Sequence, residues 1–321
     1  MSAELNNRKF PLVSIVTPAY NQAAFLRDTI ESVLSQDYPN IEYIVFDDGS
    51  TDETRKVLEE FDGRVRWESH ANMGQTPTIN KGWKALTGDI VAWLNSDDTF
   101  LPGAIGRAAG YLLNNPGTQI VFGDTLFTEA DGTPIEPSRP LPLFSYENFV
   151  VSCENPIAQP SAFIRREVIE NTGLLDPYYY YFMDWDFWLR AGMRNRIDYI
   201  PELLSTYRLH SESKTVAEAR KAAPELERMY RKFFARDDLP DNIRKLEKKA
   251  MANMCFTSGG YYLNGGDEKS AARMAWSALR AYPQMLLNTR QIHKFIYCVF
   301  SGTKIYNDMR AAYRRLTQRE V

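Results

Sequence analysis

The chain has 321 residues, 44% of them hydrophobic and 25% charged, which is typical of a globular protein with one large domain or a large and a smaller one. Its formal net charge of −3 gives no general reason to expect a nucleic acid partner. The first residues are polar, and no apolar run approaches the ~20 residues of a membrane span. We therefore expect a cytoplasmic protein that is at most peripheral at the inner face of the cell membrane. Three widely separated cysteines predict neither a disulfide framework nor a zinc site.

The first hundred residues alternate short apolar runs with helical patterns. The apolar runs predict strands at residues 12–17, 41–46, 65–69 and 90–95. A helical pattern follows the first strand, where apolar residues recur at helical spacing between Leu26 and Leu34. Strands that are continuously apolar and separated by helices are typical of a mostly parallel sheet buried on both faces. The sequence therefore predicts an α/β fold.

Three helix starts have specific signals in the sequence. Ser50 and Glu53 are three residues apart and predict a capping box after the second strand. Thr76 followed by Pro77 predicts the N-cap and first position of the next helix, and Pro102 predicts the start of another. Each signal follows a predicted strand closely, as expected for strand–helix units.

The second hundred residues are less regular. Residues 120–136 predict a hairpin with Asp131-Gly132 at its turn. The proline-rich residues 137–160 predict a long ordered loop. Further on, residues 183–192 predict a short helix and residues 197–210 predict strand segments.

The composition changes after about Ser211, where β-branched residues become rare, and this predicts helices over residues 215–321. Residues 260–283 predict a helix hairpin similar to one tetratricopeptide unit, although one copy is not a repeat array. We place a boundary near residue 212. The predicted organisation is a domain at 1–212, with halves at about 11–100 and 101–212, followed by a helical region at 213–321.

Asp97 and Asp98 end the fourth predicted strand. Two adjacent carboxylates repel each other unless a divalent cation lies beside them, and oxygen ligands favour Mg²⁺ or Mn²⁺. Such ions usually bind through one or two protein carboxylates and the phosphates of a substrate. The pair therefore indicates a nucleotide diphosphate site. The alternative is a solvated turn that caps the helix near Pro102.

Polar residues follow the other predicted strands as well. Asp48, after the second strand, could accept a hydrogen bond from a base or a ribose, or belong to a turn in which Ser50 caps a helix. Tyr20, after the first strand, could stack on a base or pack in the core. Because ligands bind beyond the carboxyl ends of parallel strands, we expect a nucleotide site at this edge.

Three segments together resemble the family 2 glycosyltransferases. They are residues 13–54, residues 88–98 with the sequence GDIVAWLNSDD, and residues 173–192 with the sequence GLLDPYYYYFMDWDFWLRAG. The resemblance covers roughly residues 11–212 and implies that the domain at 1–212 has the GT-A fold. The first half would then bind the nucleotide-sugar and the second half the acceptor.

The resemblance implies a role for each residue that matches a family motif. Asp97 would contact the ribose or sugar, and Asp98 would ligate Mn²⁺ or Mg²⁺ on the diphosphate. The family usually reads Ala-Arg-Asn where this chain has residues 79–81, so the role of Lys81 stays open. The complete nucleotide-sugar site implied in this way is Thr17, Pro18, Ala19, Tyr20, Asp48, Asn72, Lys81, Ser96 and Asp97.

The implied catalytic base is Asp184. The family usually has Glu-Asp at this point, and here Met183 replaces the glutamate. Asp186 is the competing carboxylate. Residues two apart on a helix point in different directions, so Asp184 and Asp186 cannot both serve one hydroxyl.

Several further residues have two interpretations. His210, in a Tyr-Arg-x-His context similar to that of related chains, could ligate the metal or lie on the surface. Gln159 could border the sugar site, and the tyrosines at 178–181 could stack on an acceptor sugar or pack in a turn. Arg165 and Arg166 are expected at a solvated helix start.

The implied activity is that of an inverting, metal-dependent hexosyltransferase. It would move a sugar from a nucleotide-diphosphate sugar, with UDP favoured, to a hydroxyl of a saccharide or lipid-linked saccharide in bacterial surface polysaccharide or glycan synthesis. A nucleotidyltransferase would need a basic phosphate-binding loop after the first strand, which is absent here. A scaffold protein with a degenerate nucleotide-sugar site would lack the carboxylates that this chain retains.

The end of the chain is basic. Residues 289–321 contain seven Lys and Arg against two acidic residues, interleaved with aromatic and aliphatic ones. This pattern predicts peripheral contact of the C-terminal helices with an anionic membrane surface. The alternative is that the apolar side packs on its own domain.

Overall fold

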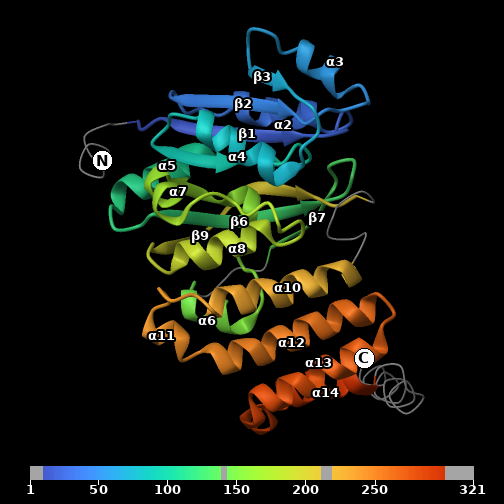
Figure 1. Ribbon diagram of the computed structural model, residues 1–321. Helices are drawn as coiled ribbons and strands as arrows, with labels where there is room; N and C mark the ends of the chain where they lie inside the picture. The colour runs from blue at the N-terminus through green and yellow to red at the C-terminus, as the bar shows by residue number, and fades with distance from the viewer. Residues whose placement is uncertain (1–9, 139–142, 211–218, 301–321) are drawn as a thin grey trace, which may run out of the picture. The chain divides into compact units, whose positions relative to one another are not determined.

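The computed structural model describes residues 10–138, 143–210 and 219–300. The chain divides into two compact units (Figure 1). The sheet unit comprises residues 1–146 and 155–210, and the helical unit comprises residues 147–154 and 211–321. The helical unit therefore includes a short segment from within the first 212 residues.

Among the described residues, the sheet unit holds one sheet of nine strands. Their order is β3-β2-β1-β4-β8-β6-β9-β5, with β7 beside β6. The first four strands pair in parallel, β8 is antiparallel to β4 and β6, and β9 is parallel to β6. The predicted α/β fold is confirmed, and the sheet is mixed, with four parallel and four antiparallel pairings among the described strands. The strands are β1 (Val13–Ala19), β2 (Ile41–Asp47), β3 (Arg66–Ser69), β4 (Ile90–Trp93), β5 (Thr99–Phe100), β6 (Ile120–Thr128), β7 (Pro134–Pro137), β8 (Phe163–Arg165) and β9 (Ile197–Arg208).

Helices cover both faces of the sheet, which explains the continuously apolar strands. On one face, Val13 and Ile15 of β1 belong to a core with residues of α2 and α5. On the other face, Gly82 of α4 approaches β1 so closely that an added Cβ would lie 2.3 Å from Val16 Cγ2. The helices of this unit are α2 (Leu26–Leu34), α3 (Thr54–Glu59), α4 (Gln75–Ala85), α5 (Ala104–Asn114), α7 (Arg166–Thr172) and α8 (Met183–Gly192).

The predicted capping box at Ser50 and Glu53 is wrong. Helix α3 begins at Thr54, whose backbone N–H donates to Asp52 Oδ1 at 2.9 Å. Ser50 Oγ instead accepts the backbone N–H of Asn21 at 2.9 Å, so it joins the ends of β1 and β2. Helix α4 also begins before the predicted Thr76, at Gln75.

Other local predictions are confirmed. Strands β6 and β7 form the expected hairpin, in which Asp131 Oδ1 accepts the Thr133 N–H at 2.9 Å. The predicted helix at 183–192 is α8. Residues 197–208 form one continuous strand instead of separate segments. The predicted loop at 137–160 contains helix α6 (Tyr146–Ser152) and the start of the 3₁₀ helix η1 (Gln159–Ser161).

Arg165 and Arg166 do not lie at a solvated helix start. Arg165 is 2% exposed and donates from Nε to Thr118 O at 2.7 Å and from Nη2 to Leu112 O. Arg166 donates from Nε to Gly88 O at 2.6 Å. Both guanidinium groups therefore donate hydrogen bonds to backbone carbonyls of the sheet unit.

The helical unit contains mainly antiparallel helices. Helices α12 and α13 form the hairpin predicted at 260–283, and Asp267 caps α13 by accepting the Ser270 N–H at 3.0 Å. All three cysteines are buried free thiols in this unit. No helix in the described ranges is long and apolar enough to span a bilayer. The remaining elements are α10 (Ala219–Phe234), α11 (Asp241–Arg244), α12 (Glu247–Asn264), α13 (Glu268–Ala281), η2 (Pro283–Leu287) and α14 (Thr289–Phe300).

Candidate active site

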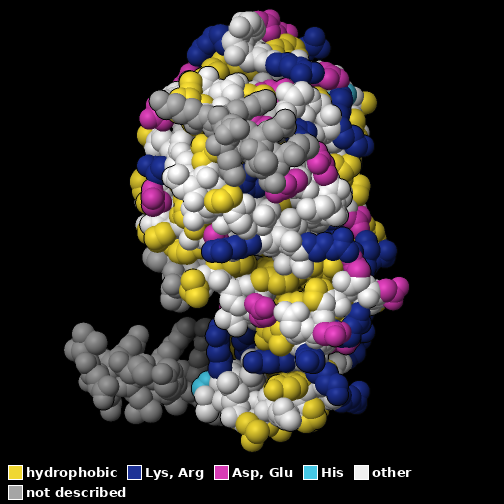
Figure 2. Space-filling view, turned by 90° about the vertical axis from the view of Figure 1, so that its left-hand side faces the viewer, with side chains coloured by type: hydrophobic (Ala, Val, Ile, Leu, Met, Phe, Trp, Pro, Cys, Tyr) yellow, Lys and Arg dark blue, Asp and Glu magenta, His cyan; other side chains and the backbone are white. Residues whose placement is uncertain are grey.

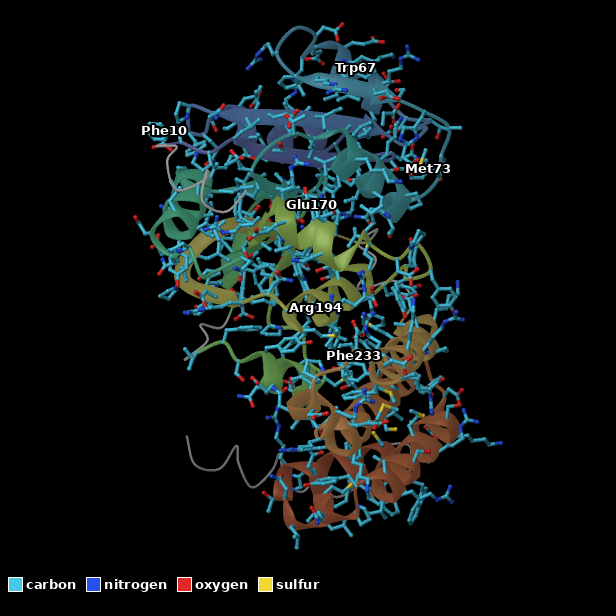
Figure 3. All side chains as sticks on the ribbon, turned by 60° about the vertical axis from the view of Figure 1, so that its left-hand side comes forward. Phe10, Trp67, Met73, Glu170, Arg194 and Phe233 are labelled. Carbon is cyan, nitrogen blue, oxygen red and sulfur yellow. The ribbon has the colours of Figure 1, made fainter. Side chains whose placement is uncertain are left out.

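Asp48 fixes the loop that follows β3. Its carboxylate accepts the backbone N–H groups of Met73 at 2.7 Å and Gly74 at 2.9 Å, and Met73 is labelled in Figure 3. Next to it, Gly49 has φ +75°, and an added Cβ would lie 2.7 Å from Asn72 N. The ends of β2 and β3 therefore meet closely, and Asn72 is exposed at this edge.

The four predicted residues at the end of β1 differ in exposure. Thr17, Pro18 and Ala19 are buried, and Thr17 Oγ1 lies 3.1 Å from Tyr43 Oη. Tyr20 is 47% exposed, so its ring is available to a ligand. The backbone carbonyl of Ala19 accepts the Asp48 N–H at 2.8 Å, which places Tyr20 next to the Asp48 loop.

Asp97 and Asp98 lie in different environments. Asp98 is 1% exposed, and its carboxylate accepts the backbone N–H of Arg208 at 3.1 Å and Asn95 Nδ2 at 3.2 Å. Burial, and then the neighbouring Asp97 charge, raise the pKa of Asp98 well above its ordinary value. The Asp97 side chain is 23% exposed, and its Oδ2 lies 3.0 Å from His210 Nε2. Asp97 is therefore the more accessible of the two carboxylates, and the buried His210 lies beside it, while Asp98 is held inside.

Arg208 is a residue of this site that the sequence analysis did not identify. Its side chain is 7% exposed and donates to Asp97 O at 3.1 Å, Ala130 O at 2.8 Å and Asp28 Oδ2 at 2.9 Å. The guanidinium also lies 4.9 Å from the ring centre of Phe25. Arg208 thus ties the Asp97 backbone to α2 and to the β6–β7 turn. Its position two residues before the predicted His210 was a signal in the sequence.

Side-chain amides join the end of β4 to two other segments. Asn95 Oδ1 accepts Gln75 Nε2 at 2.8 Å, and Asn95 Nδ2 donates to Gln159 Oε1 at 3.0 Å. Gln159 Nε2 in turn donates to the Trp93 carbonyl at 2.7 Å. This network fixes Gln159 beside the Asp97–Asp98 segment, where the sequence analysis expected it to border the sugar.

The first turn of α4 touches three carboxylate-bearing segments through consecutive residues. Gly74 donates its N–H to Asp48, and Gln75 bonds to Asn95. Thr76 Oγ1 lies 2.8 Å from Met183 Sδ, beside Asp184. Because three adjacent residues reach all three segments, the segments that carry Asp48, Asp97–Asp98 and Asp184 meet at one helix N-terminus. The N-terminus of a helix favours negative charge such as that of phosphate groups.

Asp184 and Asp186 have different partners. Asp186 is 5% exposed and accepts Arg190 Nε at 2.8 Å, so its charge is already paired. Asp184, in the first turn of α8, accepts Asn155 Nδ2 at 3.1 Å and is partly exposed. Burial raises the pKa of Asp184 to about 6. A carboxylate with this pKa is ionised at neutral pH and is more basic than an ordinary aspartate.

The remaining predicted residues are placed as follows. Lys81 pairs with Glu68 of β3, and its Nζ lies 5.0 Å from the ring centre of Phe46. Ser96 is 5% exposed. Tyr178 and Tyr180 are 52% and 55% exposed on the loop before α8, whereas Tyr179 between them is buried.

The donor set at Asp97 and His210 fits a divalent cation. One carboxylate oxygen and one imidazole nitrogen lie within hydrogen-bond distance of each other. Both are ligands that Mn²⁺ accepts, and the carboxylate also suits Mg²⁺. No group of three such side chains occurs among the described residues. Any ion held here would take its other ligands from a diphosphate and water, as Mg²⁺ sites commonly do.

Comparisons with known proteins identify the family. The family described as Glycosyl transferase family 2 matches residues 14–173. A relative from Rickettsia prowazekii, the uncharacterized glycosyltransferase RP339, is 29% identical over 64% of this chain and 66% of that protein. Bacillus subtilis TuaG, a putative teichuronic acid biosynthesis glycosyltransferase, is 33% identical over 39% of this chain and 51% of that protein. The chain thus spans at most about two thirds of these two relatives.

Solved structures share the fold. Residues 1–349 of Staphylococcus aureus TarS, in complex with UDP-GlcNAc, match with a TM-score of 0.65 and 15% identity over 90% of both chains. The mannosyltransferase PcManGT from Pyrobaculum calidifontis, in complex with GDP-Man and Mn²⁺, matches with a TM-score of 0.56 and 18% identity over 92% of this chain and 91% of that one. With its GT-A fold and its family match, the chain belongs to the family 2 glycosyltransferases.

Proposed function

We propose that the chain is a metal-dependent inverting glycosyltransferase that uses a UDP-sugar. The observation that carries this proposal is the contact of three consecutive residues at the α4 N-terminus with the segments of Asp48, Asp97–Asp98 and Asp184. A nucleotide-sugar needs a nucleoside site, a diphosphate site and a base within one small region, and these segments supply all three.

In this proposal the donor lies across the carboxyl ends of β1, β2 and β4. Tyr20 stacks on the base, and the Asp48 loop and Asn72 border the nucleoside. Thr17, Pro18, Ala19 and Ser96 form the buried wall behind it, and Lys81 lies farther out with Glu68. UDP is favoured because TarS, with the same fold, was solved with UDP-GlcNAc.

Asp97 and His210 would hold Mn²⁺ or Mg²⁺ against the diphosphate. From the sequence we expected Asp98 to ligate the ion. Both Asp98 oxygens accept internal hydrogen bonds, so we assign the ligand role to Asp97. When bound, the ion supplies charge stabilisation to the departing diphosphate. Asp98 and Arg208 hold the Asp97 backbone in place, and the α4 N-terminus adds its dipole.

Asp184 acts as the general base. It takes the proton from an acceptor hydroxyl as the oxygen attacks the anomeric carbon, and the bond to the diphosphate breaks on the opposite side, which inverts the configuration. Asn155 holds the carboxylate in position through its 3.1 Å hydrogen bond. General-base assistance of this kind contributes about 10²–10⁴-fold to the rate.

We further propose that the acceptor is a saccharide or lipid-linked saccharide of a bacterial surface polysaccharide. The similarity to TuaG, whose name assigns it to teichuronic acid biosynthesis, supports this acceptor class. Peripheral membrane contact is supported by exposed apolar residues of the helical unit. These are Trp276, Leu286, Leu287, Tyr297 and Phe300. Much of the basic tail on which this contact was predicted lies outside the described residues, beyond Phe300.

The deciding experiment is calorimetric titration of the chain with UDP, dTDP and GDP, each with Mn²⁺ and with EDTA. We expect UDP to bind in the presence of Mn²⁺ and to bind much more weakly in EDTA. Binding of GDP or dTDP instead of UDP would change the proposed donor nucleotide but would still support a glycosyltransferase. Failure of all three to bind folded protein would contradict the proposal and favour a scaffold role.

A further inference from the structure

A short segment, residues 147–154, belongs to the helical unit although the residues on both sides of it belong to the sheet unit. We call this segment the strap. It contains most of helix α6 and the two residues that follow that helix. In Figure 1, α6 lies beside α10 and α12. Peptide bonds at 146–147 and 154–155 join the strap to the sheet unit, so the connection is covalent.

Side chains of the helical unit hold the end of α6. The last carbonyl groups of a helix have no partner within the helix, so they need donors from elsewhere. Tyr230 Oη of α10 donates to the Val150 carbonyl at 3.2 Å, and Asn253 Nδ2 of α12 donates to the Val151 carbonyl at 2.7 Å. The Val150 side chain is fully buried. The strap is therefore fixed by buried hydrogen bonds within the helical unit.

Cys153 turns the chain after α6. Its φ is +52°, a left-handed conformation that residues other than glycine rarely adopt. The Cys153 side chain is fully buried, and its carbonyl accepts Thr257 Oγ1 of α12 at 3.2 Å. A strained residue keeps such a conformation only where its surroundings hold it. The helical unit therefore fixes the backbone from which the chain returns to the sheet unit.

An exposed ion pair contributes less to holding the strap. Glu154 Oε1 lies 3.2 Å from Arg290 Nη2 and 3.7 Å from Lys294 Nζ, both on α14. Lys and Arg side chains gather at several places on the helical unit, in the lower part of Figure 2. Exposed ion pairs of this kind stabilise little. The bonds to the strap carbonyls are therefore the ones that a test should remove.

The two residues that border the strap contact both ends of α8, the helix that carries Asp184. At its last turn, Tyr146 Oη donates to the Leu189 carbonyl at 2.5 Å. The Tyr146 ring also packs closely on Gly192, where an added Cβ would lie 2.3 Å from Tyr146 Cδ2. At its first turn, Asn155 Nδ2 donates to Asp184 Oδ2 at 3.1 Å.

The Asn155 amide is oriented by its neighbours. Its Oδ1 accepts the Ile157 N–H at 3.1 Å, which leaves Nδ2 directed at Asp184. Asn155 is thus fixed on one side by the sheet unit and on the other by its peptide bond to the strap. Burial raises the pKa of Asp184 to about 6, and the bond from Asn155 opposes this rise because it favours the charged form.

We propose that the helical unit positions Asp184 through the strap. Tyr230, Asn253 and Thr257 hold the strap, and the strap keeps Asn155 in the geometry of its bond to the Asp184 carboxylate. This role of the helical unit rests on the proposed function, in which Asp184 is the base. The three side chains belong to the helical unit and act through Asn155, so they are positioning residues.

The test measures the pKa of Asp184 by NMR titration of isotope-labelled aspartate carboxyl carbons in the full chain. The Asp184 signal is the one that disappears in Asp184→Asn. The strap variant is Tyr230→Phe/Thr257→Val, which removes two hydroxyl donors to the strap and nearly preserves the shapes of both side chains. A second variant, Asn155→Ala, removes the hydrogen bond to Asp184 itself.

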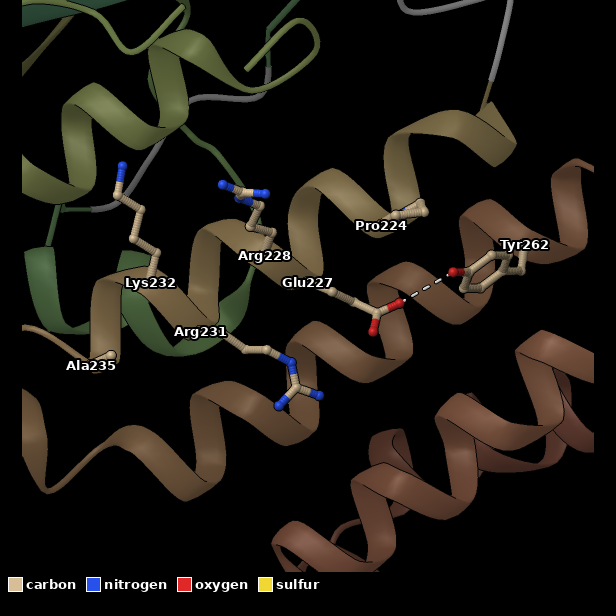
Figure 4. A pocket seen from close by; sticks show the side chains of 7 residues that line it. All are labelled: Pro224, Glu227, Arg228, Arg231, Lys232, Ala235 and Tyr262. Atoms are coloured by element: carbon tan, nitrogen blue, oxygen red, sulfur yellow. Dashed lines mark hydrogen bonds between the residues drawn. The ribbon is translucent and has the colours of Figure 1, made fainter. Parts of the chain in front are cut away.

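The matched control is Tyr262→Phe/Ser258→Ala, which also removes one phenol hydroxyl and one aliphatic hydroxyl from the helical unit. Tyr262 Oη donates to Glu227 Oε1 at 3.3 Å, as Figure 4 shows, and Ser258 Oγ lies 3.5 Å from Met254 Sδ. These partners lie on α10 and α12 and not in the strap. The control therefore perturbs the same helices without loosening residues 147–154.

We expect the Asp184 pKa to rise by about 1 in Asn155→Ala, because a hydrogen bond to a charged group is lost. It should rise by at least about 0.3 in the strap variant and by less than about 0.1 in the control. Adding the strap substitutions to Asn155→Ala should have no further effect, because their effect passes through Asn155. UDP affinity with Mn²⁺ should change less than about twofold in the strap variant.

Three results would overturn the proposal. They are an unchanged Asp184 pKa in the strap variant, an equal rise in the control, and a strap effect that persists in Asn155→Ala. Loss of UDP binding together with the pKa change would likewise show a general structural effect and not positioning. Failure of the proposed function is recognised separately. If Asp184→Asn kept its transfer rate, Asp184 would not be the base, and the titration would still show whether the strap sets its pKa.

Discussion

His210 Nε2 lies 3.0 Å from Asp97 Oδ2, although 113 residues separate them in the chain. The pairing of Thr99 with Thr206 between β5 and β9 brings these two segments together. The His210 side chain is 6% exposed, and its ring centre lies 4.8 Å from that of Phe25. A ring held in this way loses little freedom when it binds an ion, so the pair is preorganised.

The two aspartates should respond differently to substitution. We expect Asp97→Asn and His210→Gln each to weaken Mn²⁺ binding in the presence of UDP by at least about tenfold, because each removes a ligand. Asp98→Asn should change Mn²⁺ affinity less than about threefold, because its oxygens face internal donors. Electron paramagnetic resonance of free Mn²⁺ measures all three. The reverse ranking would return the ligand role to Asp98.

Transfer should depend on the ionisation of Asp184. With a pKa of about 6, the rate should rise with pH through a midpoint near that value and then level off. Asp184→Asn should lower the rate by about 10²–10⁴-fold and leave the UDP dissociation constant nearly unchanged. UDP release and calorimetry measure the two quantities. A variant that keeps its rate and loses UDP binding would show that Asp184 is not the base.

The same substitution should stabilise the protein at high pH. The pKa of Asp184 is raised from 3.8 to about 6 in the folded state, so its contribution to stability is full below pH 3.8 and is lost as the pH rises through 6. Asp184→Asn removes the cost of the buried charge. Because the side chain is partly exposed, we expect a gain of about 1–2 kcal/mol at pH 8 and little change at pH 4. Urea unfolding at both pH values measures this; equal changes at both would show that Asp184 ionises normally.

Arg208 should matter for stability as well as for the ion. Arg208→Gln leaves the Asp97 and Ala130 carbonyls without a charged donor, and we expect a loss of about 2–3 kcal/mol in the free energy of unfolding. Mn²⁺ affinity should also fall, since the Asp97 backbone is released. Arg208→Lys should recover part of the stability but not the bonds to three acceptors. An Arg208→Gln protein of unchanged stability would show that these bonds contribute little.

Gly49 and Gly63 offer a matched comparison. Both have positive φ, +75° and +77°, but an added Cβ at Gly49 would lie 2.7 Å from Asn72 N, and at Gly63 it would meet nothing within 4 Å. Gly63→Ala should therefore cost about 1 kcal/mol from backbone strain alone. Gly49→Ala should cost more and should weaken UDP binding, because the Asp48 loop must shift. Thermal unfolding measures the loss of stability and calorimetry measures UDP binding. Equal losses of stability in the two variants would mean that the Asp48 loop moves without strain.

The parts of the fold that were predictable depend on local patterns. Strands β1 to β4 and their helices follow from apolar runs and helical spacing, which record burial on both faces of the sheet. The predicted capping box at Ser50 was wrong because Ser50 Oγ accepts a hydrogen bond from the backbone N–H of Asn21, 29 residues away in the chain. The prediction of a solvated Arg165 was wrong for a similar reason, because the carbonyls that accept its hydrogen bonds lie 47 and 53 residues away in the chain.

The candidate site also has features that local motifs predict and features that depend on tertiary contacts. Asp48, Asp97 and Asp184 could be selected from motifs, because each lies at a strand end or a helix start. Which aspartate of the pair at 97–98 stays accessible could not be predicted, since Arg208 of a distant strand decides it. The gathering of all three segments around one helix N-terminus is likewise a tertiary contact without a local signal.

The pairing of β5 with β9 has a consequence for the order in which the protein acquires its site during synthesis. Residues 11–100 leave the ribosome first and contain nearly every donor-side residue. Asp97 nevertheless lacks His210 and Arg208 until the last strand of the sheet has been made and inserted between β6 and β5. A nascent chain that ends before residue 206 can therefore form the early strands but cannot complete the proposed ion site, so Mn²⁺ binding is expected only after this unit has been completed on the ribosome.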